Sequence, residues 1–483
     1  MTGAALGVAA VLGLAVVGVH LLDRQLRGGG RQRRGEGARW ASKRDLRALR
    51  VKGAEPGRLV LGRHGRHLIA AEARASVVVV GPSTVSLKTT GFAIPAVLEW
   101  AGPVVVASVK SDVLMATIER RRALGKTMVW DPTGVTGIES VKATPLSACG
   151  SWRGAMRTAH RLSSSARAGG AGGLEDADFW YAAAEKLIAP LLYAAAASGG
   201  QMGDVIRWLN EGAEAEPDVT AALVEAQEAE ALSAWNANWN RDERQRSSIY
   251  TTAETILGAW ADPRVLDASS AAEYTPAELL DGGANTLYLC APAHEQERLR
   301  SQFASMLSEL VGVIYELSAK TGKPIDPAIL LVLDETANIA AMADLDVVAS
   351  TGAGQGIQVV AVFQDMAQAE ARYGARAKTI VNNFRARVFA SGIGDPATLA
   401  YVSQIVGEAE FRQRSETKAE RGRASATEGS EYRSLTPASV VRGAAPGTAL
   451  LVYGHLPPAP IALRPWFRDR RLTELVEGGR DGR

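Results

Sequence analysis

The sequence predicts an α/β fold, with a mostly parallel sheet, an inserted all-α domain and an N-terminal transmembrane helix. Three observations predict it. From about residue 68 onward, short apolar runs alternate with amphipathic stretches, a pattern typical of parallel sheets covered by helices. Between Trp152 and Pro263 this alternation stops, and a composition rich in Ala, Glu, Gln, Trp and Leu indicates helices only. The third observation is an apolar N-terminus.

The N-terminal run Gly3–Leu22 consists of small and aliphatic residues broken only by His20. It is long enough to cross a bilayer as a helix. It lacks the charged start and small-residue cleavage signal of a secretory peptide, which favours an uncleaved anchor. The competing interpretation, a buried Ala-rich helix, rarely stays apolar on every face over such a length. Five arginines follow the run directly: Arg24, Arg27, Arg31, Arg33 and Arg34. By the positive-inside rule they predict a single-pass cell-membrane protein with most of the chain in the cytoplasm.

A basic stretch comes next. Gly28–Gly37 is typical of a flexible linker, and positive charge continues as far as Lys52. This charge suits either anionic lipid headgroups or nucleic acid. Directly after an anchor, the lipid interpretation is favoured.

The overall composition is that of a globular protein. The 483 residues are 47% hydrophobic and 22% charged, with a net charge of +2 that argues neither for nor against nucleic acid. Cys149 and Cys290 are far apart and have no neighbours at metal-ligand spacing, which excludes a zinc ribbon or a disulfide framework. We expect both thiols to be buried in a reducing compartment.

The strands are predicted where apolar runs are bounded by turn residues. A solvated linker is expected at 413–431, where the sequence is charged and lacks a period. A closing pair of strands is expected at 447–454 and 461–464. The strands expected before it are 76–80, 104–108, 127–130, 286–290, 329–333, 357–363 and 387–390.

The strand at 76–80 leads into a candidate phosphate-binding loop. Lys88 opens a helical segment expected from Thr89 to Glu99, and a strand–loop–helix unit aims backbone N–H groups and the positive helix end at an anion. Lys88 is assigned to the β- and γ-phosphates, and the Thr89 hydroxyl to Mg²⁺. The set assigned to the nucleotide is Gly81, Ser86, Lys88, Thr89 and Thr90. The loop departs from the usual pattern, which has Gly directly before the Lys where this chain has Leu87.

Two later strands also end in polar side chains. The strand at 329–333 ends in Asp334 and Glu335, and in open α/β sheets ligands bind at the carboxyl ends of strands. Asp334 is assigned to Mg²⁺, and Glu335 is assigned as the general base for the attacking water. The strand at 357–363 ends in Gln364, a candidate sensor of the γ-phosphate. The predicted catalytic set consists of Lys88, Glu335 and Gln364.

These motifs together resemble the type IV secretion coupling proteins, the TraG/TraD-type conjugative DNA-transfer ATPases. The resemblance extends from about Ala38 to Arg470. It implies a RecA-like P-loop domain using ATP and Mg²⁺, a membrane anchor and a hexameric ring. It also implies recruitment of a relaxase–DNA complex, bound without sequence specificity, or of protein substrates to a secretion channel. The motifs that carry the likeness are Lys88–Pro95, Asp178–Trp180, Ser248–Pro263, Asp334–Ile339, Gln364–Gly374, Ala377–Asn383 and Leu451–Pro458.

Two other functions compete with this one. A non-hydrolysing coupling adaptor is favoured by Leu87, whereas Asp334, Glu335 and Gln364 count against it. An FtsK-like DNA pump would need several membrane helices and a DNA-reading module, which the sequence does not show. Arg376, Arg385 and Arg387 are candidates for an arginine finger. The predicted domains are an anchor (1–22), a basic lead-in (23–67), the two parts of the nucleotide-binding domain (68–150 and 271–470), the all-α insertion (151–270) and a tail (471–483).

Overall fold

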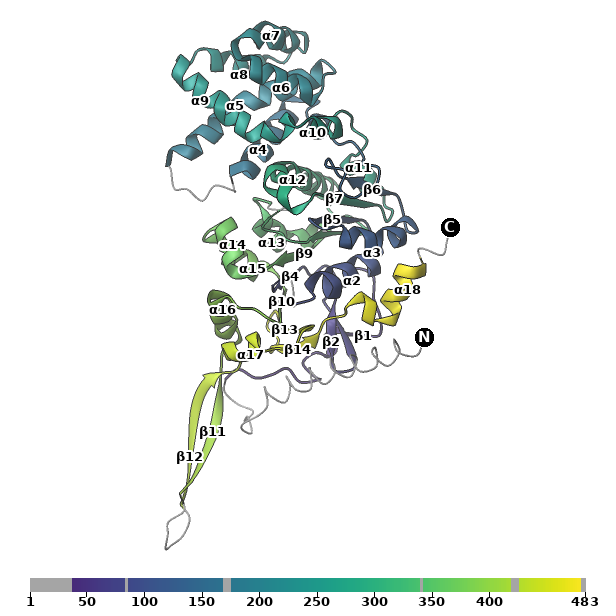
Figure 1. Cartoon of the computed structure of the whole chain (residues 1–483), viewed down its shortest axis with the longest axis vertical. Coiled ribbons are helices and arrows are strands. Elements are labelled where there is room, and N and C mark those ends of the chain that lie inside the picture. Colours follow the sequence, from purple (N-terminus) through teal and green to yellow (C-terminus); the bar gives the residue numbers. More distant parts are fainter. Residues whose placement is uncertain (1–36, 83–85, 168–174, 339–341, 418–424, 479–483) are drawn as a thin grey trace. The chain divides into compact units, whose positions relative to one another are not determined.

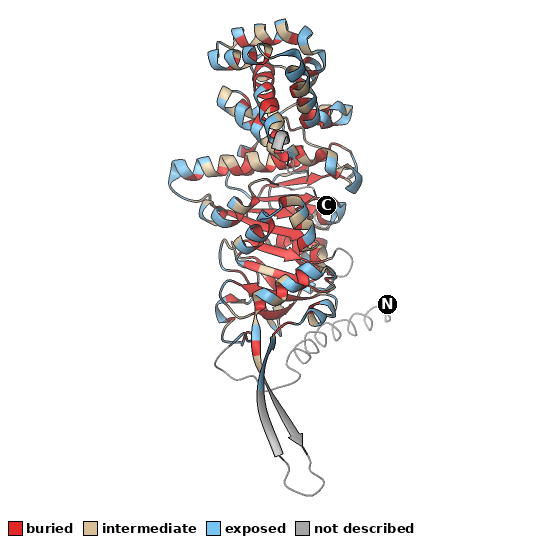
Figure 2. Ribbon diagram, turned by 90° about the vertical axis from the view of Figure 1, so that its left-hand side faces the viewer, coloured by how far each residue is buried: buried red, intermediate tan, exposed pale blue. Residues whose placement is uncertain are grey.

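The computed structural model describes residues 37–82, 86–167, 175–338, 342–417 and 425–478 (Figure 1). The chain forms two compact units. The first unit contains Met1–Trp100, Val359–Glu370 and Ala377–Arg483, and the second contains Ala101–Gln358 and Ala371–Arg376. Each unit contains strands and a buried apolar core, and Figure 2 shows the strands as predominantly buried.

Three parallel strands form the centre of the first unit. β4 (Val77–Val80) pairs with β9 (Ile357–Phe363) and with β10 (Ala386–Ala390), and both pairings are parallel. Every residue of β4 and β9 is buried, which explains why these strands are apolar throughout rather than alternating. The predicted strands at 76–80, 357–363 and 387–390 are confirmed.

Antiparallel strands extend this sheet beyond β10. The order continues through β13 (Thr448–Tyr453), β14 (Ala459–Ala462), β2 (Val60–His64), β3 (His67–Ala70) and β1 (Arg50–Val51). The predicted closing pair is confirmed as β13 and β14. The three strands β1 to β3 were not predicted, because they are short and depend on their partners for their extended shape.

The solvated linker predicted at 413–431 is wrong for the residues that the structure describes. β11 (Glu408–Thr417) pairs antiparallel with β12 (Ser425–Ser434), in register from Glu408↔Ser434 to Thr417↔Ser425 (Figure 1). An antiparallel ladder is held by backbone hydrogen bonds, so a two-stranded ribbon can form without the apolar alternation that a buried strand shows. The polar composition therefore concealed the hairpin.

The helix that follows the phosphate loop begins as a π-helical turn. This turn, η2 (Thr89–Ala93), continues into α2 (Ile94–Glu99), which confirms the helical segment predicted from Thr89 to Glu99. The later helices are α14 (Met366–Tyr373), α15 (Arg376–Asn383), α16 (Pro396–Val406), α17 (Ala438–Arg442) and α18 (Arg470–Gly478).

The sheet of the second unit is entirely parallel among its paired strands. Its order is β8 (Ile329–Leu333), β5 (Val104–Ser108), β7 (Thr286–Cys290) and β6 (Thr127–Trp130). All four strands were predicted. The helices that accompany them are α3 (Ser111–Arg122), α12 (Gln296–Thr321) and α13 (Leu345–Gln355).

A helical segment connects β6 to β7, and none of its described residues forms a strand. Its core includes Leu187, Leu191, Trp235 and Trp260, all nearly inaccessible to solvent. The helices are α4 (Trp152–Arg167), α5 (Glu175–Ala197), α6 (Met202–Glu211), α7 (Glu216–Glu225), α8 (Ala229–Trp239), α9 (Glu243–Leu257), α10 (Pro263–Ala268) and α11 (Pro276–Leu279). The domain boundaries at 151 and 270 stay a prediction.

The predicted membrane anchor, Gly3–Leu22, lies outside the described residues. Among the helices that are described, none combines the length and apolar character needed to span a bilayer.

Candidate functional site

Leu87, directly before Lys88, has a backbone conformation that glycine usually adopts. Leu87 has φ = 56°, in the left-handed region that L-residues with a side chain seldom adopt. Its carbonyl oxygen accepts a hydrogen bond from the N–H of Gly91 at 2.7 Å, in the first helical turn. Its side chain packs against Gly447: a Cβ built there would lie 3.3 Å from Leu87 Cδ1. The Leu87 side chain is therefore accommodated because Gly447 has no side chain.

The polar groups of the loop suit a phosphate. Lys88 is 3% exposed, and its Nζ lies 3.5 Å from the carbonyl oxygen of Phe363. Ser86 is fully buried and donates to the carbonyl oxygen of Pro82. The Thr90 hydroxyl is buried and has no hydrogen-bond partner among the described residues. A buried ammonium and an unpaired hydroxyl at the start of a helix are groups that an anion would stabilise.

Gln364 lies next to this loop. β4 and β9 are parallel neighbours with Val80 opposite Phe363, and the N–H of Gly81 donates to the Phe363 carbonyl at 3.1 Å. Gly81 leaves no space for a side chain, because a Cβ there would lie 2.8 Å from that of Ala390. The first unit thus brings Lys88 and Gln364 to the carboxyl ends of two adjacent strands.

The second unit holds the acidic pair at the carboxyl end of β8. Asp334 is 2% exposed. Its N–H donates to the carbonyl oxygen of Ala107 at 2.9 Å, and its Oδ2 accepts a hydrogen bond from Ser108 at 3.4 Å. Ser108 is the last residue of β5, the strand beside β8. The carboxylate is therefore oriented by a neighbouring strand.

Glu335 adopts a strained backbone conformation. Its φ is 61°, and a left-handed residue with a side chain costs roughly 1–2 kcal/mol. Backbone strain of this kind is common at functional sites, where the surrounding structure maintains it. Asn338 supplies part of that structure, since its Nδ2 donates to Glu335 Oε2 at 3.0 Å.

Asp131 organises a loop that the sequence did not single out. It follows β6 and accepts the N–H groups of Thr136 and Thr133 at 2.7 and 3.1 Å, and the Thr133 hydroxyl at 2.7 Å. Burial alone would raise the pKa of Asp131, but these hydrogen bonds outweigh it and the pKa is lowered. Sequence reasoning also missed Ser108, the last residue of β5, and Asn338, in the turn after β8, although a ligand site is expected at these carboxyl ends.

No group of three or more His, Cys, Asp and Glu side chains is arranged to hold a metal in the described part of the chain. A magnesium ion that arrives with a nucleotide does not require such a group. Such an ion takes most of its ligands from phosphates and water, and only one or two from the protein. Thr89, in the first unit, and Asp334, in the second, stay predicted ligands of this ion.

The three candidate finger arginines are engaged within their own chain. Arg376 donates to Asp346, Arg385 pairs with Glu72 at 2.9 Å, and Arg387 donates to Asn382 at 3.0 Å. A finger that acts in a neighbouring subunit would first have to leave these partners. The assignment of a finger stays a prediction.

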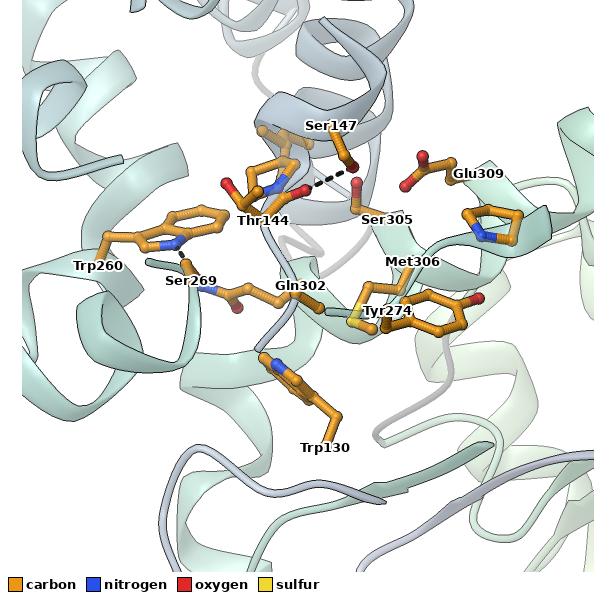
Figure 3. A pocket seen from close by; sticks show the side chains of 14 residues that line it. Trp130, Thr144, Ser147, Trp260, Ser269, Tyr274, Gln302, Ser305, Met306 and Glu309 are labelled. Atoms are coloured by element: carbon orange, nitrogen blue, oxygen red, sulfur yellow. Dashed lines mark hydrogen bonds between the residues drawn. The ribbon is translucent and has the colours of Figure 1, made fainter. Parts of the chain in front are cut away.

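A separate cavity in the second unit does not serve as the nucleotide site. It holds about 20 Å³, which is room for about one water molecule. Figure 3 shows it between Trp130, Trp260, Tyr274 and Gln302, with Trp260 Nε1 donating to Ser269 at 3.0 Å. The indole N–H of Trp130 and the amide nitrogen of Gln302 have no partner among the described residues. We expect one buried water to satisfy them.

The backbone of Leu87 predicts how substitutions there behave. Leu87→Gly should keep nucleotide affinity within about threefold of the wild type, because residue 87 already has a glycine-type backbone conformation. Leu87→Val should weaken affinity about tenfold, because a β-branched residue is strained at positive φ by roughly 1–2 kcal/mol. Calorimetric titration with MgATP measures both. Equal affinities of the glycine and valine variants would contradict this account of the loop.

A family model described as "Type IV secretory system Conjugative DNA transfer" matches residues 39–473. The conjugal transfer protein TraG of Agrobacterium fabrum is 25% identical over 341 residues, which cover 66% of this chain. Protein VirD4 of Rhizobium radiobacter is 24% identical over 175 residues, or 35% of this chain and 25% of VirD4. The 341-residue match covers 49% of TraG, so the chain spans about half of that relative's length.

Among solved structures, the bacterial conjugative coupling protein TrwB shares the fold. Its unbound form gives a TM-score of 0.69 at 18% identity, covering 90% of this chain and 95% of the other. A TrwB complex with ADP and Mg²⁺ gives a TM-score of 0.68 at 18% identity, covering 91% and 96%. The chain therefore has the TrwB-type α/β fold.

Proposed function

The chain belongs to the type IV secretory system conjugative DNA transfer family, and from this premise we propose that it is a membrane-anchored ATPase coupling protein. In this role it recruits DNA, as a relaxase–DNA complex, or protein substrates, and uses ATP to drive them into a type IV secretion channel. The phosphate loop is the observation that carries the proposal. Its buried Lys88 follows a residue held in the glycine-type conformation.

The loop residues have distinct roles toward the triphosphate. Lys88 binds the β- and γ-phosphates as a compact charge. The N–H groups that open the helix, together with Thr90, take the remaining phosphate oxygens, and the Ser86 hydroxyl joins them once it leaves the Pro82 carbonyl. The TrwB structure in complex with ADP and Mg²⁺ supports assigning the same ligands to this chain.

Hydrolysis needs an activated water and an ion. Glu335 accepts the proton of the attacking water through its carboxylate. Thr89 and Asp334, the ligands predicted from the sequence, would hold Mg²⁺, and the ion would neutralise charge on the phosphates. Gln364, at the end of the strand beside the phosphate loop, orients the water or reports the γ-phosphate.

Assembly and location complete the proposal. Gly3–Leu22 anchors the chain as a single span in the cell membrane, with most of the protein cytoplasmic. Six copies form a ring, and lysine and arginine side chains contact DNA phosphates without sequence specificity.

One specific observation favours a second function. Leu87 replaces the loop glycine, and a coupling adaptor that binds substrate without hydrolysing ATP would tolerate this change. Against it, Leu87 keeps the glycine-type backbone and packs against Gly447. The motor is therefore the better supported of the two.

Nucleotide binding by the full-length chain tests the proposal. We expect Lys88→Ala to weaken MgATP binding about 10- to 100-fold, since a hydrogen bond to a charged group is worth about 1.5–3 kcal/mol. Lys378→Ala is the matched control, because the Lys378 side chain is 65% exposed, and it should bind like the wild type. Equal affinity of Lys88→Ala and wild type would overturn the assignment of the loop.

A further inference from the structure

The turn after β8 is built around Glu335. The N–H of Asn338 donates to the Glu335 carbonyl at 2.9 Å, and the fully buried Thr336 donates its hydroxyl to the Leu333 carbonyl at 2.8 Å. These bonds close the turn tightly. They explain how Glu335 is held at a positive φ that an isolated glutamate would avoid.

Asn338 also fixes the Glu335 side chain. Its amide Nδ2 donates to Oε2 at 3.0 Å, which is good hydrogen-bond geometry. The backbone N–H of Asn338 thus holds the backbone carbonyl of Glu335, and the side-chain amide of Asn338 holds the carboxylate of Glu335. Because the bond takes one carboxylate oxygen, Oε1 is left outside it, and a general base needs one oxygen to accept a proton.

The two hydrogen bonds from Asn338 to Glu335, here called the clamp, are anchored on a packed helix. Arg300 of α12 donates its Nε to the carbonyl oxygen of Asn338 at 3.2 Å. Its helix neighbours Leu299 and Phe303 are fully buried, so α12 is held firmly by the core. Rigid support of this kind determines how well a reacting group is positioned.

We propose that Asn338 is a positioning residue for the reaction, which holds the Glu335 carboxylate with Oε2 occupied and Oε1 presented to water. This inference rests on the proposed ATPase function. Asn338 contacts the general base and does not act on the nucleotide itself. It therefore affects turnover rather than binding.

The test measures kcat, KM and MgATP affinity for the full-length chain. Asn338→Ala should lower kcat about 10- to 100-fold, because a displacement of about 1 Å can cost about 10²-fold, while MgATP affinity changes less than about twofold. Asn338→Asp should lower kcat at least as much, since it keeps the shape but places a second carboxylate beside the first. Asn210→Ala, at an exposed position of α6, is the control. A fall in affinity parallel to kcat would indicate a merely structural role and overturn the proposal, as would an unchanged kcat.

A double variant separates the clamp from the function on which it depends. In a Glu335→Gln background, Asn338→Ala should cause no further loss, because residues that act as one unit are not additive. A further tenfold loss in that background would contradict a role through Glu335. If wild-type protein does not turn over ATP, or if Glu335→Gln turns over normally, the proposed function fails whatever Asn338 does.

Discussion

Glu335→Gln is expected to lower ATP turnover about 10²- to 10⁴-fold, the range that a general base contributes. The amide keeps the size of the carboxylate but cannot accept the proton of the attacking water. Binding of MgATP should persist, because the phosphate contacts come from the loop around Lys88. Turnover is measured as phosphate release and binding by calorimetric titration.

The control for this prediction is Glu225→Gln, at an exposed position of α7. It carries the same chemical change far along the chain from the acidic pair, and we expect wild-type turnover from it. If Glu335→Gln retained full turnover while Glu225→Gln did the same, Glu335 would not be the base.

Arg464→Ala is expected to destabilise the first unit by about 3–5 kcal/mol, the penalty for removing one partner of a buried ion pair. Arg464 is 5% exposed. Its guanidinium donates to both oxygens of Glu99 at 2.8 and 3.0 Å, and to Asp469 at 3.0 Å. Its backbone N–H donates to the Gly91 carbonyl at 3.1 Å. The substitution therefore removes both hydrogen bonds that the Glu99 carboxylate, 6% exposed, accepts from Arg464, and leaves Asp469 with Arg63 as its ion-pair partner.

Urea denaturation measures this loss against Arg470→Ala. Arg470 pairs with Glu474 at the surface, where the two side chains are 94% and 60% exposed, and such a pair contributes about 0.3–0.5 kcal/mol. A loss below about 1 kcal/mol for Arg464→Ala would refute a central role for the buried cluster.

The cluster also predicts a pH dependence. Burial raises the pKa of Asp469, but hydrogen bonds from Arg464 and Arg63 outweigh this effect, and the pKa is lowered. A lowered pKa stabilises the fold above the pKa of the unfolded chain, and this contribution is lost as the pH falls. The difference between wild type and Arg464→Ala should therefore shrink in acid.

The parallel strands could be predicted from the sequence because a strand that is buried on both faces is apolar at every position. Val77–Val80 and Ile329–Leu333 are apolar at every position, and both strands are completely buried. Asp334 and Glu335 were singled out by the rule that ligands bind at the carboxyl ends of parallel strands. These inferences need only local sequence and one topological rule.

Features that depend on distant partners were not predictable. Arg50–Val51 becomes a strand because it pairs with β3, and the polar residues of β11 become one because they pair with β12. The sequence marks Leu87 as a departure, but only the structure shows its positive φ and its contact with Gly447. Likewise, the hydrogen bond from Asn338 to Glu335 arises from a turn whose shape no periodicity encodes.

Phosphate release from ATP by the full-length chain, with and without single-stranded DNA, tests the central claim most directly. The account predicts turnover that DNA stimulates and that both Lys88→Ala and Glu335→Gln strongly lower. A folded, oligomeric protein that shows no turnover above these variants would contradict the motor and leave the adaptor that binds substrate without hydrolysing ATP.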